Sequence, residues 1–384
     1  AAVAGHPFLG FVLAMLAGAC AGFVTAFLQT HLGVPSILAG IITNTGLYTV
    51  NLAIMGFSSN VPMLKTETVF TMARALFGEK SPYKLIVAVT ITVVACALLI
   101  LFLGTRLGLS IRATGDNPDM VRASSINTAF TITVGLCVSN AMTSLSGAVL
   151  AQYQKSADIN LGTGMVVIGL ASLIIGETLF GRGGMWVKAA AAVAGSVIYR
   201  FIIALALRAN VPSECLKLIS AVIVALATAA PAPKRTLRCA AAVPSARKGA
   251  RPMLDLNHVS MTFNPGTVNE KKALTDINLH MESGEFATIV GSNGAGKSTL
   301  FNAIAGSFIP DTGNILLDGV DMTFQPDFRR SKAIGRLFQD PLKGTAPNMT
   351  IEENLALAYL RASTHTSPFS RITKADRELF TDRL

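Results

Sequence analysis

The nine residues from Gly291 to Thr299 read GSNGAGKST and match the phosphate-binding loop pattern G-x-x-x-x-G-K-[ST]. Glycines in such a loop allow positive φ angles and bring the backbone close to a phosphate group. Lys297 would reach the β and γ phosphates of a nucleotide, and the Ser298 hydroxyl would ligate Mg²⁺. We therefore predict ATP and Mg²⁺ as cofactors. The predicted nucleotide-binding residues of the loop are Gly291, Ser292, Asn293, Gly294, Ala295, Gly296, Lys297, Ser298 and Thr299.

The residues on either side of the loop supply the elements that would position it. An apolar run at 285–290 (EFATIV) predicts a strand leading into the loop, and the run at 298–305 (STLFNAIA) predicts a helix leading out. The first N–H groups of that helix, and the positive end of its dipole, would face the bound anion. A glycine-rich turn can match the pattern by chance, but the order of strand, loop and helix favours a nucleotide site.

Charge divides the chain into two parts. Residues 1–252 hold 19 Lys and Arg against 7 Asp and Glu, whereas residues 253–384 hold 13 against 15. A basic protein can bind nucleic acid, but these charges lie between long apolar runs and not on one basic face, so we expect no nucleic-acid partner. The length of 384 residues predicts at least two domains. The five cysteines show no close pairing, which predicts neither a disulfide framework nor a metal site.

Apolar runs in the first part are long enough to cross a bilayer, which takes about 20 residues per helix. The run at 85–104 carries no charge, which speaks against a soluble helical core. The predicted spans are 8–30, 37–56, 84–105, 128–151, 163–180, 185–207 and 214–230. Polar residues in them that could line a solute path, or simply hydrogen-bond between helices, are Thr43, Asn44, Thr45, Ser139, Asn140, Thr143 and Ser144. Glu177 lies near the cytoplasmic end of its span, where gating or helix packing fits it better than contact with a solute.

The orientation in the membrane follows from Lys and Arg in the short loops, which favour the cytoplasmic side. The segment 231–251 has six of them and leads into the nucleotide-binding part, so we place it in the cytoplasm. Counting spans back puts 106–127, with its three arginines, on the same side. The loop at 57–83 is an exception, because its basic residues fall outside by this count. The count also places residue 1 outside, so we expect the N-terminus to be truncated or processed.

The loop at 106–127 contains the segment GDNPDMVRASSIN. Asp116 or Asn117 can cap a helix and Pro118 suits its first position, so the segment predicts a turn followed by a short amphipathic helix. Such a helix could be a mere connector. With this segment, residues 1–230 resemble the permease family that includes bacterial ribose and branched-chain amino acid importers. The segment matches the position of that family's coupling helix, which would dock onto an ATPase and pass on its movement.

From residue 253 to about 362 the sequence resembles the ATPase subunit of ABC transporters. Phe263 falls where that family stacks an aromatic ring on adenine, although it could be an ordinary strand aromatic. Gln339 matches the family's Q-loop glutamine, which contacts Mg²⁺ and the attacking water, so the resemblance implies a catalytic and metal-binding role for it. Elements similar to the family's are a turn and strand at 311–319, a strand at 333–338 and a helix at 351–360.

Three motifs of that ATPase family are missing after Gln339: the LSGGQ signature, a Walker B strand ending in Asp-Glu, and a switch histidine. Without them this chain alone should bind ATP without hydrolysing it. The predicted fold class is multi-domain, with a polytopic all-α membrane domain at 1–230 and a truncated α/β P-loop NTPase domain at 253–384. Residues 231–252 form a basic Ala/Pro linker, which could mark a natural fusion or a readthrough or assembly join of two neighbouring genes.

The main functional hypothesis is a component of an ATP-driven ABC importer in the bacterial inner membrane, multi-pass, with its ATP-binding part in the cytoplasm. The cargo would be a small polar solute such as an amino acid, a nucleoside or a sugar. The resemblance implies three partners: a second permease copy, a second ATPase copy and an extracytoplasmic solute-binding protein. A membrane-anchored nucleotide-binding regulator or scaffold without transport stays open. So does an ABC exporter half, although the short loops speak against it.

Overall fold

The computed structural model describes residues 6–63, 66–78, 81–162, 165–180, 184–208, 254–338, 340–362 and 369–382 of the 384-residue chain. The chain divides into two compact units. Unit 1 comprises residues 1–104 and 132–237, and unit 2 comprises 105–131 and 238–384. The loop that follows the third long helix therefore groups with the nucleotide-binding part. The linker predicted at 231–252 lies outside the described residues.

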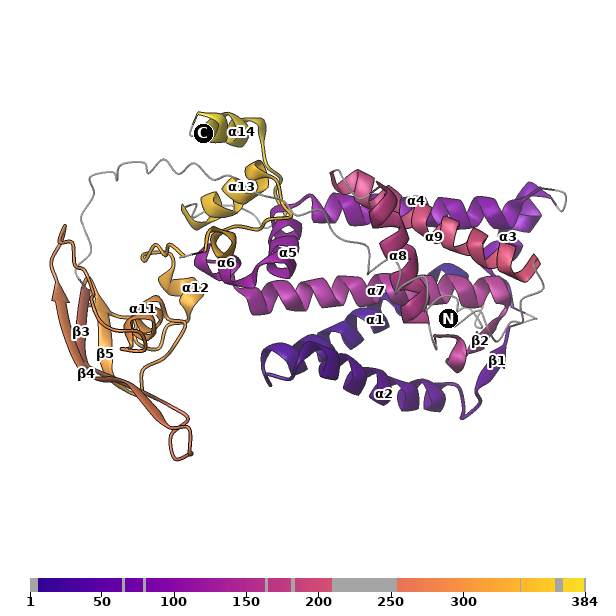
Figure 1. Ribbon diagram of the computed structural model, residues 1–384. Coiled ribbons are helices and arrows are strands. Elements are labelled where there is room, and N and C mark those ends of the chain that lie inside the picture. Colours follow the sequence, from indigo (N-terminus) through magenta and orange to yellow (C-terminus); the bar gives the residue numbers. More distant parts are fainter. Residues whose placement is uncertain are drawn as a thin grey trace. The chain divides into compact units, whose positions relative to one another are not determined.

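Unit 1 is built from helices (Figure 1), and all except α3, which lies within the loop predicted at 57–83, match spans that the hydropathy pattern predicts. They are α1 (Pro7–Thr30), α2 (Ser36–Ile54), α3 (Val69–Phe77), α4 (Tyr83–Leu103), α7 (Thr128–Gln154), α8 (Met165–Phe180) and α9 (Met185–Arg208). Among the described residues, α1, α2, α4, α7 and α9 contain stretches long and apolar enough to cross a membrane, and α8 has a shorter apolar stretch at Ile168–Phe180. The predicted span at 214–230 lies outside the described residues.

Helices α8 and α9 pack through glycine. A Cβ on Gly176 would lie 2.1 Å from the carbonyl oxygen of Ala191, and one on Gly195 would lie 2.1 Å from that of Ser172. Only glycine allows two backbones to approach this closely. Small residues at such contacts are typical of membrane helices, where close van der Waals packing replaces the hydrophobic effect as the force between helices.

A short two-stranded sheet joins the segments that follow α2 and α7. Strand β1 (Asn60–Pro62) pairs antiparallel with β2 (Ser156–Asp158), which leads into a 3₁₀ turn, η1 (Ile159–Gly162). The side-chain oxygen of Gln152 also accepts a hydrogen bond from the Val69 N–H at 3.1 Å. The two segments must therefore lie on the same side of the membrane, as the span count places them, despite the basic residues at 57–83.

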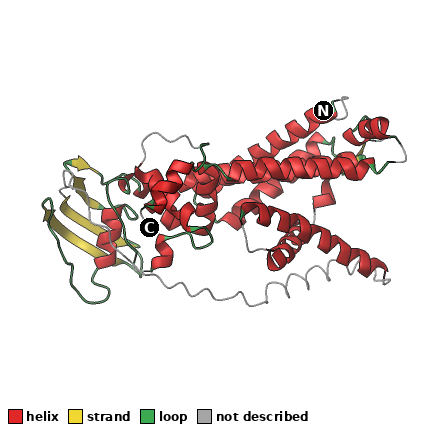
Figure 2. Ribbon diagram, turned by 90° about the horizontal axis from the view of Figure 1, so that it is seen from above, coloured by secondary structure: helices red, strands yellow, loops and turns green. Residues whose placement is uncertain are grey.

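The nucleotide-binding part of unit 2 contains one antiparallel sheet in the order β4-β3-β5-β6 (yellow in Figure 2). Its strands are β3 (Leu254–Phe263), β4 (Lys271–Met281), β5 (Thr312–Leu317) and β6 (Val320–Asp321). The helices of unit 2 are α5 (Arg106–Asp116), α6 (Pro118–Ala123), α11 (Lys297–Ala305), α12 (Asp327–Arg330), α13 (Ile351–Ala362) and α14 (Lys374–Thr381), with a 3₁₀ turn η3 (Pro341–Gly344). Leu300 and Ala303 of α11 pack on Val259 and Ile315 of the sheet in one buried cluster.

Three predicted elements of unit 2 are confirmed: the helix after the glycine loop, the strand within 311–319 and the helix from 351. The predicted strands at 285–290 and 333–338 are wrong, because neither range has regular structure. A strand needs a hydrogen-bonded neighbour, and the described sheet places none beside these ranges. The apolar runs at 285–290 and 333–338 gave no information about which strand each would pair with, and pairing decides whether a strand forms.

Candidate functional site

The glycine loop and α11 build the predicted phosphate site. Gly296 directly precedes α11 with a φ of 84°, a left-handed conformation that favours glycine. A Cβ at this position would also lie 2.4 Å from the carbonyl oxygen of Ala273 in β4. Both constraints require glycine here, so that the loop can turn tightly and α11 can begin against the sheet edge.

Lys297 ties the loop together. Its ammonium group donates hydrogen bonds to the carbonyl oxygens of Gly291 at 2.6 Å and Ser292 at 2.7 Å. The positive charge is thus held at the mouth of the loop, at the N-terminus of α11, where the helix dipole adds further positive potential. An anion beside this loop would meet a cation and a helix N-terminus together, which is a recurrent arrangement for binding phosphate.

A cavity of about 280 Å³ brings together residues from three segments. Phe263 at the end of β3 lines it opposite the loop and is braced by an edge-to-face contact with Phe308, with ring centroids 5.4 Å apart. Lys271 at the start of β4 also lines it, and the sequence analysis missed this second cation. No local motif marks Lys271, because only the pairing of β3 with β4 brings it to the loop. The lining residues are Phe263, Lys271, Ala273, Asn293, Gly294, Ala295, Gly296, Lys297, Ser298 and Thr299.

These residues fit the phosphate chain of a nucleotide better than they fit a bare metal ion. Two ammonium groups, a glycine cradle that a Cβ would fill, and a flanking aromatic ring converge on one cavity. Within the described residues no group of three or more His, Cys, Asp or Glu could hold a metal. Mg²⁺ is commonly held largely by water and substrate phosphates, so a single hydroxyl such as Ser298 is a suitable protein ligand. Gln339 lies outside the described residues.

The second feature of unit 2 is the segment Thr105–Thr131, called the docked segment below. Met120 and Val121 of α6 are buried, at 4% and 0% exposure, in a cluster with Leu357 and Phe380 of α13 and α14. Burying a side chain of this size stabilises the folded state by about 1.5–3 kcal/mol. The predicted short helix is confirmed, and its apolar face packs on the nucleotide-binding part.

Asn117 has two roles at the start of α6. Its side-chain oxygen accepts a hydrogen bond from the Met120 N–H at 3.2 Å and so caps the helix. Its amide nitrogen donates to three backbone carbonyl oxygens around η3, those of Leu342 at 2.9 Å, Lys343 at 3.1 Å and Thr345 at 2.8 Å. Sequence reasoning left Asp116 and Asn117 as alternative caps; the structure selects Asn117, while Asp116 accepts a hydrogen bond from the Asn348 N–H.

Two ion pairs join α5 to the helices of the nucleotide-binding part. Arg112 donates to Glu353 at 2.9 Å, and Arg106 donates to Asp376 at 3.3 Å. Burial raises the pKa of Glu353, but the hydrogen bonds from Thr350 and Arg112 outweigh it, so this pKa lies below its ordinary value. The pKa of Asp376 is also lowered, first by the Thr373 N–H and further by Arg106. Both carboxylates are therefore held ionised in contact with the docked segment.

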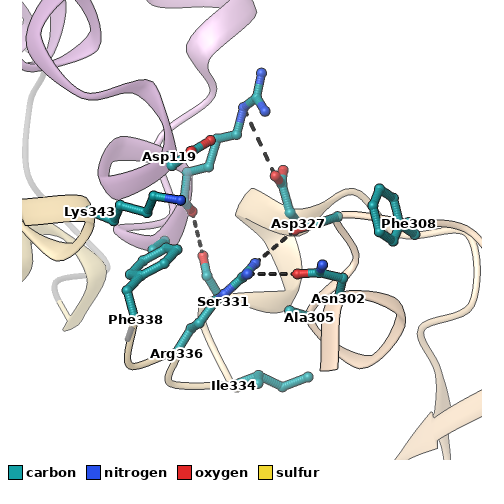
Figure 3. A pocket seen from close by; sticks show the side chains of 13 residues that line it. Asp119, Asn302, Ala305, Phe308, Asp327, Ser331, Ile334, Arg336, Phe338 and Lys343 are labelled. Atoms are coloured by element: carbon teal, nitrogen blue, oxygen red, sulfur yellow. Dashed lines mark hydrogen bonds and ion pairs between the residues drawn. The ribbon is translucent and has the colours of Figure 1, made fainter. Parts of the chain in front are cut away.

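The other side of α6 faces α12 (Figure 3). Ser331 donates a hydrogen bond from its hydroxyl to the carbonyl oxygen of Arg122 at 3.0 Å, and Arg122 lies 4.0 Å from Asp327. A cavity of about 330 Å³ lies between α6 and the end of α11. Arg336 and Asn302 both line this cavity, and Arg336 donates a hydrogen bond to the Asn302 side-chain oxygen (Figure 3). The docked segment thus contacts both the helical part around α13 and the end of α12.

The polar residues predicted for a solute path lie within unit 1, and their surroundings differ. The Thr43 hydroxyl accepts a hydrogen bond from the Thr25 hydroxyl of the neighbouring helix at 3.0 Å, which is an interhelix contact. Asn140 donates to the Leu136 carbonyl of its own helix. Thr143 lines a cavity of about 720 Å³. Sequence reasoning did not single out Asn51 or Arg200, which line the same cavity from other helices.

Residues 1–228 match the family described as branched-chain amino acid transport system, permease component. The chain belongs to this family. Residues 274–382 match a second family, described as ABC transporter. The predicted resemblance and fold class are therefore confirmed: a multi-pass helical permease is followed by an ABC-transporter ATPase domain on one chain.

Curated relatives match the two parts of this permease separately. The tyrosine transport system permease protein of Clostridioides difficile (strain R20291) is 36% identical over 217 residues, which is 56% of this chain and 70% of that protein. The tyrosine transport ATP-binding protein of the same strain is 41% identical over 107 residues, 28% of this chain and 42% of that protein. A ribose import ATP-binding protein of Streptomyces coelicolor is 40% identical over 108 residues, 28% of this chain and 20% of that protein. The chain thus spans less than half the length of these ATP-binding relatives.

Proposed function

We propose that this chain is part of an ATP-driven importer that moves a small polar solute across the bacterial inner membrane. The observation that carries the proposal is the burial of the docked segment against the nucleotide-binding part, through Met120 and Val121. A cytoplasmic loop of the permease that packs on an ATPase domain gives nucleotide-driven movement a direct route to the membrane helices. The span count supports a cytoplasmic position for this loop and for the ATPase part.

In this proposal ATP binds at the glycine loop. Lys297 and Lys271 neutralise the phosphates, the N-terminus of α11 adds positive potential, and Phe263 offers an aromatic face to the base. Ser298 supplies a hydroxyl for Mg²⁺, which would shield charge on the phosphates. Gln339 is proposed to report the state of the nucleotide to the permease, on the strength of its sequence match alone.

Amino acids are the solutes that the relatives favour, since a permease relative and an ATP-binding relative both belong to a tyrosine transport system. In that system the two parts are separate proteins, which favours their acting together here. From the resemblance to the importer family, we propose that the working assembly has a second permease copy, a second ATPase copy and an extracytoplasmic binding protein. A regulator or scaffold without transport would show no uptake that depends on a binding protein.

The test uses an assembly of this chain with a complete ATPase subunit and a binding protein, reconstituted in vesicles. Met120→Asp with Val121→Asp places two charges in a buried apolar contact, which costs several kcal/mol. We expect uptake to fail while the permease still inserts in the membrane. Asp119→Asn, an exposed change on the same helix, should leave uptake intact. Full uptake by the double variant would show that the docked segment is an ordinary connector.

A further inference from the structure

Arg200 is a charged residue inside an apolar transmembrane span. It lies in α9 within the stretch Met185–Leu205, about 8 Å along the helix axis before Leu205 at 1.5 Å per residue. Arginines inside apolar spans are rare, and they pair with another group, face a water-filled cavity or extend to the membrane surface. The surroundings of Arg200 therefore indicate what it does.

Arg200 lines a cavity of about 720 Å³ within unit 1. The walls come from α2, α7, α8 and α9 and from the segment that contains β2 and η1. A volume of this order is typical of small-molecule sites. The lining carries hydroxyl and amide groups from four different helices, namely Asn51, Thr143, Ser146, Ser172 and Ser196.

The guanidinium group of Arg200 makes no hydrogen bond or ion pair with any residue that the structure describes. Asp158 also lines the cavity, but its carboxylate accepts a hydrogen bond from the Asn160 N–H at 2.8 Å. Arg200 therefore combines an apolar span, a cavity that is mainly apolar with a few hydroxyl and amide groups, and five N–H donors that no described residue accepts. A packing role would have used those donors on the neighbouring helices.

We propose that Arg200 binds the carboxylate of the transported solute inside this cavity, an inference that rests on the import function proposed above. The planar guanidinium presents paired N–H donors that match the two oxygens of a carboxylate. The Ser146 hydroxyl can bond another polar group of the solute, and Asp158 supplies negative charge for an ammonium group. The ligand class is a small amino acid or other carboxylic acid, and not a neutral sugar.

Another explanation is that Arg200 extends its long side chain to the membrane surface. Lysine does this as well as arginine, whereas lysine cannot form the paired hydrogen bonds of a guanidinium with a carboxylate. Arg200→Lys therefore separates the two roles. Arg200→Lys keeps a positive charge at this position, as in the parent chain. We therefore expect this variant to insert in the membrane and fold as the parent does.

The experiment measures protection of a cysteine at Ser196, which lies one helical turn from Arg200 on the same face. The full chain, with its native cysteines replaced and carrying Ser196→Cys, is purified in detergent and labelled with a small thiol reagent. Two matched pairs of probes are compared: L-tyrosine with tyramine, and L-leucine with isoamylamine. The second member of each pair lacks the carboxylate. Each labelling rate is divided by the rate of the same variant without probe, which removes any effect of Arg200 on thiol reactivity.

We expect an amino acid at a concentration near its dissociation constant to slow labelling about two-fold, and the matching amine to leave the rate unchanged. Arg200→Gln and Arg200→Lys should both lose this protection. Equal protection by an amine, undiminished protection in either variant, or no protection by either amino acid up to its solubility limit would overturn the proposal. The assay needs neither ATPase nor binding protein. Protection without uptake would contradict the import function alone, and uptake without protection would contradict the Arg200 site alone.

Discussion

The Nη1 atom of Arg330 donates a hydrogen bond to the carbonyl oxygen of Ala303 at 2.7 Å, and the Arg330 side chain is fully buried. The same guanidinium also bonds the carbonyl oxygens of Ile304, Thr323 and Gln325. Ala303 and Ile304 lie in the last turn of α11, where helix carbonyls lack i+4 intrahelical partners. Arg330 thus caps the P-loop helix, while its neighbour Ser331 bonds the docked segment.

We expect Arg330→Met to loosen the end of α11, because it leaves buried carbonyl oxygens without donors. The free energy of local opening should fall by about 3 kcal/mol. Hydrogen exchange of the backbone amides at 297–306, in the full chain, measures this change. Arg329→Met is the matched control, because Arg329 is exposed and next in sequence; its effect should stay within about 0.5 kcal/mol. Similar exchange in the two variants would refute the capping role.

The ion pair of Arg112 with Glu353 should hold the docked segment in place. Reversing one charge, as in Arg112→Glu, sets two carboxylates against each other in a half-buried contact. We expect a cysteine in place of the buried Met120 to react about ten-fold faster with a thiol reagent, which corresponds to about 1.4 kcal/mol. Adding Glu353→Arg should recover part of the protection, but not all of it, because Glu353 also accepts a hydrogen bond from the Thr350 N–H at the start of α13.

The control for this charge reversal is Glu352→Lys. Glu352 lies in α13 beside Glu353, and its exposed pair with Arg377 of α14 should contribute little. The pH dependence gives a second measurement. Since the pKa of Glu353 is lowered in the folded chain, its contribution is present above the ordinary glutamate pKa of about 4.3 and is lost as pH falls through the lower folded value. Each labelling rate is divided by the rate of a free model thiol at the same pH, because the reactive thiolate becomes scarcer as pH falls. This relative reactivity at position 120 should rise at acid pH, and a flat profile would contradict the role of this pair.

Lys297 should contribute most of the charge-assisted contact with nucleotide. Lys297→Ala removes the ammonium group that the Gly291 and Ser292 carbonyls hold at the loop. A hydrogen bond to a charged group is worth about 1.5–3 kcal/mol, so we expect Mg·ATP to bind roughly 10- to 150-fold more weakly to the full chain in a fluorescence titration. Lys272→Ala, one residue beyond the cavity-lining Lys271, should bind as the parent does. Equal affinity of all three proteins would place the nucleotide elsewhere.

The features that could be predicted from sequence are those whose cause is local. Runs of about 20 apolar residues predict membrane helices because hydrophobic length alone matches the bilayer, and five of the predicted spans are confirmed by long apolar helices. The glycine loop was found because Lys297 and its carbonyl partners lie within six residues of one another. The same holds for α6, whose cap and apolar face are within one short segment.

The tertiary structure decided the contacts between residues that are far apart in the chain. Arg112 and Glu353 are separated by 241 positions, and no spacing rule links them. Lys271 lies beside the glycine loop only because β3 pairs with β4. A role for Arg200 can be proposed only because four helices line a cavity around it. The predicted strands at 285–290 and 333–338 failed for the same reason. Strand pairing, helix capping and cavity formation each depend on contacts with residues distant in the chain. A local pattern of residues does not specify those contacts.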